Sequence, residues 1–204
     1  MITIVDYGLG NVMAFANVYK TLNIPVTIAR EPQQLSGAAK VILPGVGAFD
    51  HAMQLLNESG MRPELERLVL EQRVPVLGVC VGMQMVASGS EEGRLPGLGW
   101  IEGRVIRLDP NRLPHATHLP HMGWNDVRPV RNNPLFNGLE NEARFYFLHS
   151  YYFHCGKQAD VLAVARYGDE FCCAVGAGNV HGVQFHPEKS HRFGTRLLKN
   201  FAEL

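Results

Sequence analysis

The sequence predicts an α/β fold: an open, doubly wound, largely parallel mixed sheet with helices on both faces. In the first half of the chain, short apolar runs of strand length alternate with longer segments of helical periodicity, as in successive strand–helix units of a parallel sheet. Glycine-rich turns follow several of these runs, and open sheets of this kind bind ligands at the carboxyl ends of their strands. The second half has closely spaced strand-like runs, which favour a mixed sheet or a small extra sheet.

The chain of 204 residues is predicted to form one domain, residues 1–204, with a sizeable core. Strands are predicted where β-branched and aromatic residues form short runs: 2–6, 26–29, 40–43, 74–79, 103–108, 145–153, a hairpin of 161–166 and 171–175, and a last run ending at 186. Helices are predicted where apolar residues recur at helical spacing: 12–22, a short helix within 32–38, 50–59, 61–72, 83–87, and 193–204 with Leu197, Leu198 and Phe201 buried. The proline-rich segment 109–120 is predicted to be irregular.

Composition argues against several kinds of partner and location. Lysine plus arginine and aspartate plus glutamate number 19 each, so no net charge favours nucleic acid or a membrane surface. The N-terminus reaches Asp6 without a basic segment, unlike a secretory signal, and no apolar run approaches the ~20 residues of a membrane span. Cysteines 80, 155, 172 and 173 lack zinc-site spacing. We therefore expect a reduced, cytoplasmic protein without a bound metal or cofactor.

Cys80 follows an apolar run and is flanked two positions away on each side by Gly78 and Gly82. This pattern indicates a sharp strand-to-helix turn with no room for neighbouring side chains, as G-x-S-x-G sequences provide for serine. A thiol there would lie at a helix N-terminus, where unpaired N–H groups favour the thiolate and can bind an oxyanion. The alternative is a buried structural cysteine, and this stretch alone does not separate the two.

Two other glycine pairs follow predicted strands. The sequence Pro44-Gly-Val-Gly47 leaves backbone N–H groups approachable, which suits an oxyanion or substrate site, although taken alone a plain turn explains it. Gly8 and Gly10 invite a dinucleotide-binding interpretation. Because Met13 stands where the third glycine of that motif belongs, a tight turn is the better explanation.

The sequence His186-Pro-Glu188 ends the last predicted strand. Proline turns the chain rigidly, so Glu188 can fold back on the imidazole and hold it in one tautomer. Together with Cys80 this completes a set of nucleophile, base and orienting carboxylate. A lone histidine is more often structural. His149 is a rival base, but no carboxylate lies near it in the sequence.

Seven segments carry a resemblance to a known family: 6–11, 44–47, 78–84, 90–93, 120–125, 149–151 and 184–189. Together they resemble the class I, triad-type glutamine amidotransferases, and within that class the glutaminase subunits of imidazole glycerol phosphate synthase. The resemblance covers essentially the whole chain. Segments 120–125 and 44–47 are its most specific parts, because all triad amidotransferases share the cysteine turn and the His-Pro-Glu triplet.

The resemblance implies hydrolysis of L-glutamine to L-glutamate and ammonia through a cysteinyl thioester. It makes Cys80 the nucleophile, His186 the base and later acid, and Glu188 the residue that orients the histidine. The implied oxyanion hole is formed at Gly45, Val46, Gly47 and Val81, the glutamine pocket by Gln84, His149, Ser150 and Tyr151, and the partner interface by Trp124 and Lys189. The implied partner is a (βα)₈-barrel cyclase, bound as a heterodimer, that uses the ammonia to make imidazole glycerol phosphate and AICAR in histidine biosynthesis.

Three segments depart from this pattern: 95–100, the surroundings of Cys155, and 189–194. They are more similar to a paralogous branch associated with surface-polysaccharide genes, whose ammonia serves a synthetase that amidinates a sugar. A cysteine peptidase or stress hydrolase of similar fold is an alternative from another class, but such proteins typically carry histidine directly after the cysteine, where Val81 stands here. A catalytically silent scaffold would be expected to lack part of the triad, and all three residues are present.

Overall fold

The protein is described by a computed structural model covering residues 1–113 and 117–204. Within these residues, eight strands form one mixed sheet in the order β2-β1-β3-β4-β12-β11-β10-β7. The first five strands run parallel, and β11, β10 and β7 continue the sheet in antiparallel pairs. Two two-stranded sheets, β5-β9 and β6-β8, complete the structure. The predicted fold class is confirmed, and so are both alternatives for the second half, a mixed sheet and a small extra sheet.

The strands are β1 (Ile2–Val5), β2 (Val26–Ala29), β3 (Val41–Gly45), β4 (Val76–Cys80), β5 (Gly103–Arg107), β6 (His121–Asp126), β7 (Arg128–Pro129), β8 (Arg144–His149), β9 (Tyr151–Cys155), β10 (Val161–Tyr167), β11 (Asp169–Ala177) and β12 (Val180–Val183). The α-helices are α1 (Val12–Thr21), α2 (Phe49–Glu58), α3 (Arg62–Glu66), α4 (Val81–Met85) and α5 (His191–Glu203). A π-helical turn, Arg67–Glu71, extends α3, and short 3₁₀ turns include Pro32–Leu35 and Pro187–Lys189.

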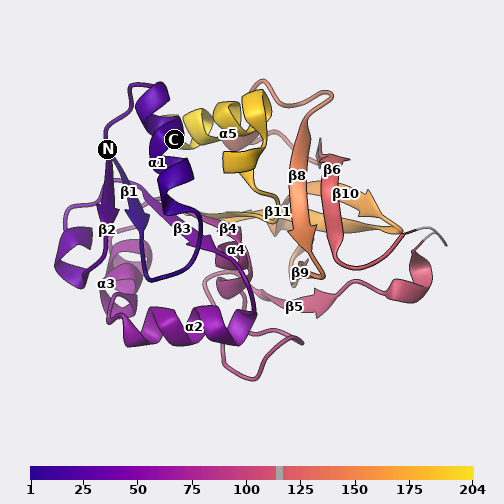
Figure 1. The fold of residues 1–204 in the computed structure, drawn as a ribbon, viewed down its shortest axis with the longest axis horizontal. Helices are drawn as coiled ribbons and strands as arrows, with labels where there is room; N and C mark the ends of the chain where they lie inside the picture. Colours follow the sequence, from indigo (N-terminus) through magenta and orange to yellow (C-terminus); the bar gives the residue numbers. More distant parts are fainter. Residues whose placement is uncertain (114–116) are drawn as a thin grey trace.

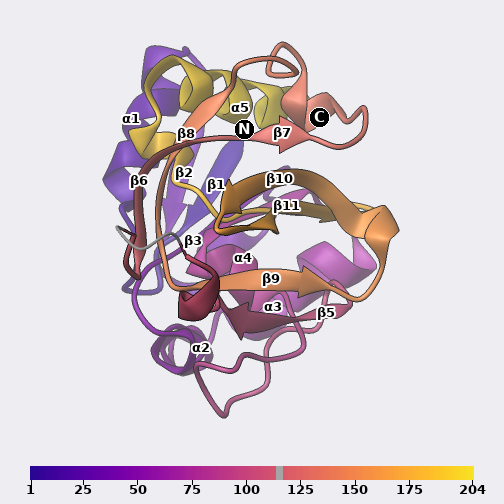
Figure 2. The ribbon, with the colours of Figure 1, turned by 90° about the vertical axis from the view of Figure 1, so that its right-hand side faces the viewer.

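The helices cover the two faces of the parallel half of the sheet. Figure 1 shows α1 and α5 on one face and α2 and α3 on the other. Helices α1 and α5 are joined by apolar packing and by a hydrogen bond from the hydroxyl of Tyr19 in α1 to the carbonyl of Leu198 in α5 (3.2 Å). Leu197, Leu198 and Phe201 of α5 are fully buried, as predicted. The two small sheets lie against the antiparallel end of the large sheet, and β8 of one is followed directly in the chain by β9 of the other (Figure 2).

Most predicted elements are confirmed within one or two residues, and the strand 26–29 and the hairpin about 167–170 are found as predicted. The single strand predicted over 145–153 is wrong. The chain bends at Ser150, so β8 pairs with β6 while β9 pairs with β5 in a different sheet. The helix predicted at 83–87 begins two residues earlier, directly after Cys80. The irregular segment predicted at 109–120 contains a 3₁₀ turn, Pro110–Arg112, and its residues 114–116 lie outside the described part.

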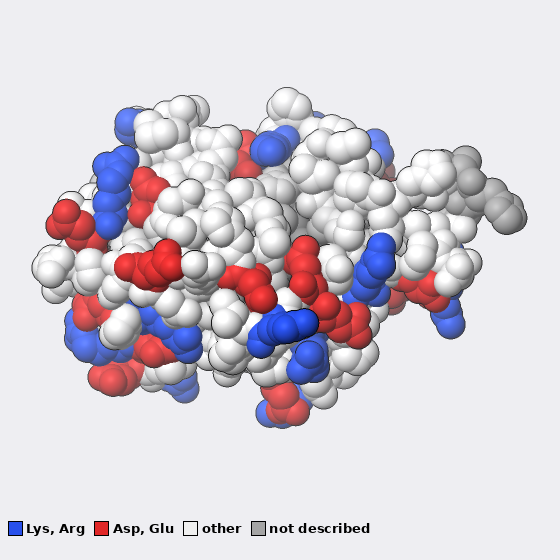
Figure 3. All heavy atoms as spheres, turned by 60° about the horizontal axis from the view of Figure 1, so that its bottom comes forward, with Lys and Arg blue, Asp and Glu red and all other residues white. Residues whose placement is uncertain are grey.

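Acidic and basic side chains are interspersed on the face seen in Figure 3, in keeping with the balanced composition. In the described part of the chain, no helix is both long enough and apolar enough to cross a membrane.

Candidate active site

Three neighbouring parallel strands bring the three predicted functional segments together. In the centre, β4 pairs with β3 on one side and with β12 on the other, and Gly45 is the register partner of Cys80. Parallel strands end at the same edge of a sheet. The Pro44–Gly47 turn, Cys80 and the His186 segment therefore meet at one place.

Cys80 occupies a strained turn between β4 and α4. Its backbone has φ 55° and ψ −113°, a conformation that residues with a side chain rarely adopt. A Cβ on Gly82 would collide with the carbonyl oxygen of Leu43, and one on Gly78 would press against the backbone of Gly82. The two flanking glycines are thus required by close backbone packing, as the sequence predicted. The turn presents the thiol at the start of a helix whose first N–H groups have no intrahelical acceptor.

The Pro44–Gly47 turn is anchored at one end and open at the other. A Cβ on Gly45 would collide with the amide nitrogen of Gly82, and the hydroxyl of buried Tyr7 donates to the carbonyl of Pro44 (2.8 Å). Gly47 has φ 83° and open space around it. The peptide between Val46 and Gly47 can therefore change direction while Gly45 stays fixed, which suits an oxyanion donor that is set in place on binding.

His186 is held by its backbone and by its ring. Its N–H donates to the carbonyl of Tyr146 in β8 (2.8 Å), and its own carbonyl accepts from the buried hydroxyl of Ser190 (2.6 Å). Its ring Nδ1 lies 2.9 Å from Oε1 of Glu188. Burial opposes a charge on His186, but hydrogen bonding and charge from Cys80 and Glu188 outweigh it and raise its pKa from 6.5 to about 10. The arrangement favours an imidazolium next to the sulfur.

Replacing Glu188 with glutamine is expected to lower the pKa of His186, because one of the two groups that raise it loses its charge. In the parent, the raised pKa of His186 stabilises the fold fully below the unfolded value of 6.5, and this contribution is lost as pH rises toward about 10.

Because the pKa of His186 is lower in Glu188→Gln, the alkaline decline of kcat/KM should begin at lower pH in the variant than in the parent. A pH–rate profile measures this, and an alkaline limb unchanged by the substitution would contradict the assignment.

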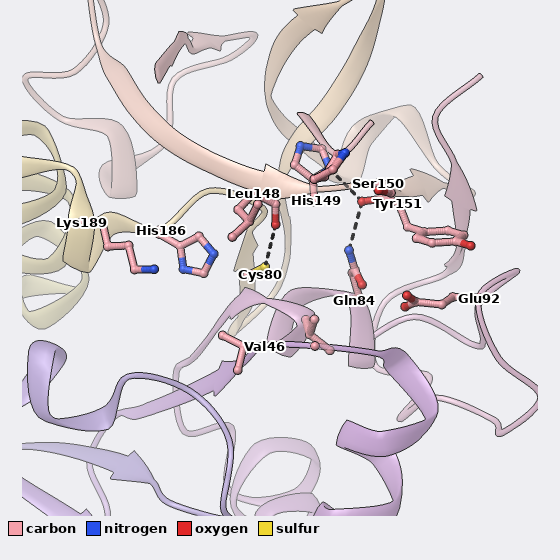
Figure 4. A pocket seen from close by; sticks show the side chains of 13 residues that line it. Val46, Cys80, Gln84, Glu92, Leu148, His149, Ser150, Tyr151, His186 and Lys189 are labelled. Carbon is pink, nitrogen blue, oxygen red and sulfur yellow. Dashed lines mark hydrogen bonds between the residues drawn. The ribbon is translucent and has the colours of Figure 1, made fainter. Parts of the chain in front are cut away.

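A cavity of about 330 Å³ opens beside Cys80. Its lining comprises Val46, Gly47, Cys80, Val81, Gln84, Glu92, Pro120, Leu148, His149, Ser150, Tyr151, His186 and Lys189. All four predicted glutamine-binding residues are thus brought together with the thiol and the imidazole. In Figure 4, His186 and Lys189 lie on one side of Cys80, and Gln84 and Glu92 on the other. Of the predicted site residues, Gly45, Glu188 and Trp124 lie outside the lining.

His149, the rival base, is engaged elsewhere. Its Nδ1 lies 2.9 Å from the carbonyl oxygen of Tyr151, and its Nε2 lies 3.0 Å from Nδ1 of His121. Burial, reinforced by the neighbouring His121, lowers its pKa to about 3. A ring with both nitrogens occupied and little affinity for a proton does not suit a general base, whereas the pKa of His186 is raised.

Sequence reasoning assigned no role to four residues that the structure places at the site: Tyr7, Glu92, Gln184 and Ser190. Glu92 accepts a hydrogen bond from the first N–H of α2, at Phe49 (3.0 Å), and this holds its carboxylate at the cavity. Gln184 is fully buried beside Cys80. Glu92 and Gln184 both lie in segments that carried the family resemblance. The sequence signal that could have identified them as site residues is a polar side chain in a glycine-rich loop or at the end of a strand. The described residues include no cluster of histidine, cysteine and carboxylate side chains able to hold a metal.

Comparison with known proteins shows the family to which the chain belongs. Residues 3–204 match the family model for glutamine amidotransferase class-I. Over the full length of both chains, the protein is 63% identical to the imidazole glycerol phosphate synthase subunit HisH of Bdellovibrio bacteriovorus and 52% identical to that of Leptospira borgpetersenii. A crystal structure of a glutamine amidotransferase superposes with a TM-score of 0.75 at 24% identity, covering 99% of this chain and 97% of the other.

A cysteine on a strained strand-to-helix turn, next to a carboxylate-held histidine, defines the site of a triad-type amidotransferase, and the chain belongs to the class-I glutamine amidotransferase family. Within that family it belongs with the HisH subunits of imidazole glycerol phosphate synthase.

Proposed function

We propose that this protein is the glutaminase subunit of an imidazole glycerol phosphate synthase in the cytoplasm. It hydrolyses L-glutamine to L-glutamate and passes the ammonia to a cyclase partner in histidine biosynthesis. The observation that carries the proposal is the joint placement of Cys80, His186 and Gln84 around one cavity of about 330 Å³. The names of the full-length relatives support the choice of synthase. Mixing the protein with glutamine and measuring glutamate, with and without the cyclase, tests it.

In the proposed reaction, the Cys80 thiolate attacks the side-chain amide carbon of glutamine. Backbone N–H groups at Val81 and in the Gly45–Gly47 turn stabilise the resulting oxyanion. The His186 imidazolium gives its proton to the leaving nitrogen, so ammonia departs and a glutamyl thioester remains. His186 then takes a proton from water as that water attacks the thioester, and the products are glutamate and the free thiol. Glu188 holds the histidine in the required orientation throughout.

Glu92 is proposed to bind the α-amino group of glutamine. Because Glu92 and His186 lie on opposite sides of Cys80 in Figure 4, a glutamine with its amide carbon at the sulfur would extend toward this carboxylate. An acidic group at that end pairs with an ammonium, and Gln84 and the 149–151 segment line the space between.

Glu92→Gln is therefore expected to raise KM for glutamine about ten- to hundredfold with a much smaller change in kcat. The amide retains an acceptor for the Phe49 N–H, so the start of α2 stays in place. Glu91→Gln is the matched control, because Glu91 also accepts a backbone N–H, from Arg107 (2.9 Å), but does not line the cavity. Equal KM values in the two variants would argue against the proposed contact.

The cyclase is proposed to dock on an apolar ridge formed by Met122, Trp124 and Leu148, which are 64%, 41% and 39% exposed. Met122 and Leu148 face each other across β6 and β8, and Leu148 also lines the cavity. Exposed apolar side chains that adjoin one another mark interaction surfaces. Lys189, exposed beside the cavity with its Nζ 5.9 Å from the centre of the Tyr146 ring, would supply a charge to set the docking register.

Lys189→Glu is expected to weaken complex formation about tenfold or more and to reduce partner-stimulated turnover, with less effect on basal hydrolysis. Lys20→Glu is the control, because α1 runs back from the carboxyl edge of the sheet and Lys20 lies in its last turn. Titration of each variant with the cyclase measures the difference. If the parent chain neither binds the cyclase nor responds to it, the histidine-pathway proposal fails, and the sugar-amidinating synthetase becomes the partner to test by coexpression and a glutamine-dependent product assay.

A further inference from the structure

Gln184 lies against the sulfur of Cys80 in the buried interior, just beyond β12. Its side chain has no exposed surface, and its Nε2 lies 3.7 Å from Sγ of Cys80. Its Oε1 accepts a hydrogen bond from Nε2 of Gln84 (3.0 Å). The reaction steps described above require neither the burial of Gln184 nor its contact with the Cys80 sulfur.

The neighbours of Gln184 fix which end of its amide faces the sulfur. Nε2 of Gln84 donates to the carbonyl oxygen of Tyr151 (3.0 Å), an atom that can only accept. The second hydrogen of the same nitrogen then points to Gln184, which must present its oxygen there. The NH₂ group of Gln184 is thereby turned toward Cys80. A reversed amide would bring two donors together at Gln84 and an oxygen against the sulfur.

A longer chain of hydrogen bonds fixes the Tyr151 carbonyl in turn. Nδ1 of His149 donates to this carbonyl (2.9 Å), so Nε2 of His149 must accept from Nδ1 of His121 (3.0 Å). Nε2 of His121 then accepts from the side-chain amide of Asn125 (3.2 Å), whose nitrogen also donates to the carbonyl of Arg166 (2.8 Å). Burial lowers the pKa of both histidines, to about 4 for His121 and about 3 for His149, so both are neutral and can accept. Carbonyl oxygens at both ends allow only one direction of donation.

We infer that Gln184 is a catalytic residue that donates an N–H to the Cys80 sulfur and stabilises its thiolate, and that the chain from Asn125 to Gln84 fixes the direction of that donor. The inference rests on Cys80 being the nucleophile. A sulfur anion accepts hydrogen bonds more strongly than a thiol. A donor aimed at it from a dry, fixed position therefore favours the reactive form before glutamine enters. His121, His149 and Asn125 act through other groups and are positioning residues.

The test is the pH dependence of iodoacetamide alkylation at Cys80 in the full chain, followed by mass spectrometry of the Cys80 peptide. Gln184→Met removes the donor and keeps the side-chain length. Gln184→Asn keeps a buried amide and withdraws it from the sulfur. Both are expected to move the alkylation midpoint upward by about one pH unit, and so to slow alkylation about tenfold at pH values below the midpoint. The kcat for glutamine should fall by a similar factor with little change in KM.

Asn200→Leu is the matched control, because Asn200 is a buried amide of α5 that donates to two carbonyls far from the cysteine, those of Leu135 (3.0 Å) and Asn137 (2.8 Å). It should lower the melting temperature and leave the alkylation midpoint unchanged. Folded Gln184 variants whose midpoint equals that of the parent would overturn the inference and leave Gln184 a structural residue.

A measurement on the unaltered chain removes dependence on the variants. By NMR, the side-chain amide protons of Gln184 should shift with the same pH midpoint as alkylation, and Cys80→Ser should abolish that titration. Amide resonances that do not respond would overturn the inference even if no Gln184 variant folds. Because neither measurement uses glutamine, a failure of the proposed glutaminase activity is seen separately.

Discussion

Replacing Cys80 with serine is expected to reduce glutamate release by about 10⁴-fold or more while the fold is retained. The turn that holds Cys80, the cavity and the Glu188-held imidazole would all remain. A serine hydroxyl, however, gives up its proton far less readily than a thiol, so very little alkoxide would form next to His186. The alcohol would therefore attack an unactivated amide very slowly. Glutamate release under saturating glutamine measures the loss.

Cys172→Ser provides the control for this substitution. Cys172 is also a buried, free cysteine, and its Sγ lies 3.3 Å from the carbonyl oxygen of Ala174, which a serine hydroxyl could equally reach. It lies outside the cavity lining, so its replacement should leave turnover near that of the parent. Retention of a tenth of the parent activity in Cys80→Ser would rule out Cys80 as the nucleophile.

Binding of the cyclase is expected to raise the rate of glutamine hydrolysis by about two to three orders of magnitude over that of the free chain. One proposed oxyanion donor, the N–H of Val81 at the start of α4, is fixed by the packing of Gly82. The other would come from the turn in which Gly45 is anchored and a Cβ added at Gly47 would meet open space. A missing or misdirected donor of this kind costs roughly 3 kcal/mol of transition-state stabilisation. A partner docked at the cavity mouth would select the productive direction.

Single-turnover measurements with and without the cyclase distinguish this effect from tighter glutamine binding. The expected change is in the rate of thioester formation, with a smaller change in the glutamine concentration that half-saturates the protein. An unrelated barrel protein at the same concentration serves as the control. A free chain that already forms the thioester as fast as the complex would show that both donors are in place without a partner.

The elements around Cys80 could be predicted because their causes are local in the sequence. An apolar run followed by glycines two residues either side of a cysteine specifies a turn with its own sterics, and the structure shows those contacts at Gly78 and Gly82. The pairing of His186 with Glu188 depends on only two residues of separation. In such short-range patterns, the local geometry is determined by residues that are close together in the sequence.

The features that could not be predicted depend on contacts between distant segments. The run 145–153 is strand-like throughout, and its division at Ser150 is decided by two partners, β6 and β5, that lie earlier in the chain. Glu92 reaches its acceptor position through the N-terminus of α2, 43 residues away, and Gln184 meets Cys80 across 104 residues. Periodicity reports which side chains are apolar, but it does not report which strand will lie alongside.

At position 80, the residue that the proposed activity requires is one that lowers the stability of the fold, because of its backbone conformation. A residue with a side chain at φ 55° and ψ −113° costs about 1–3 kcal/mol, and only the surrounding packing keeps it there. Glycine would adopt the same conformation without that cost, yet it would have no sulfur. The most stable residue at this position is therefore an inert one, and any selection for thermal stability alone would be expected to remove the thiol.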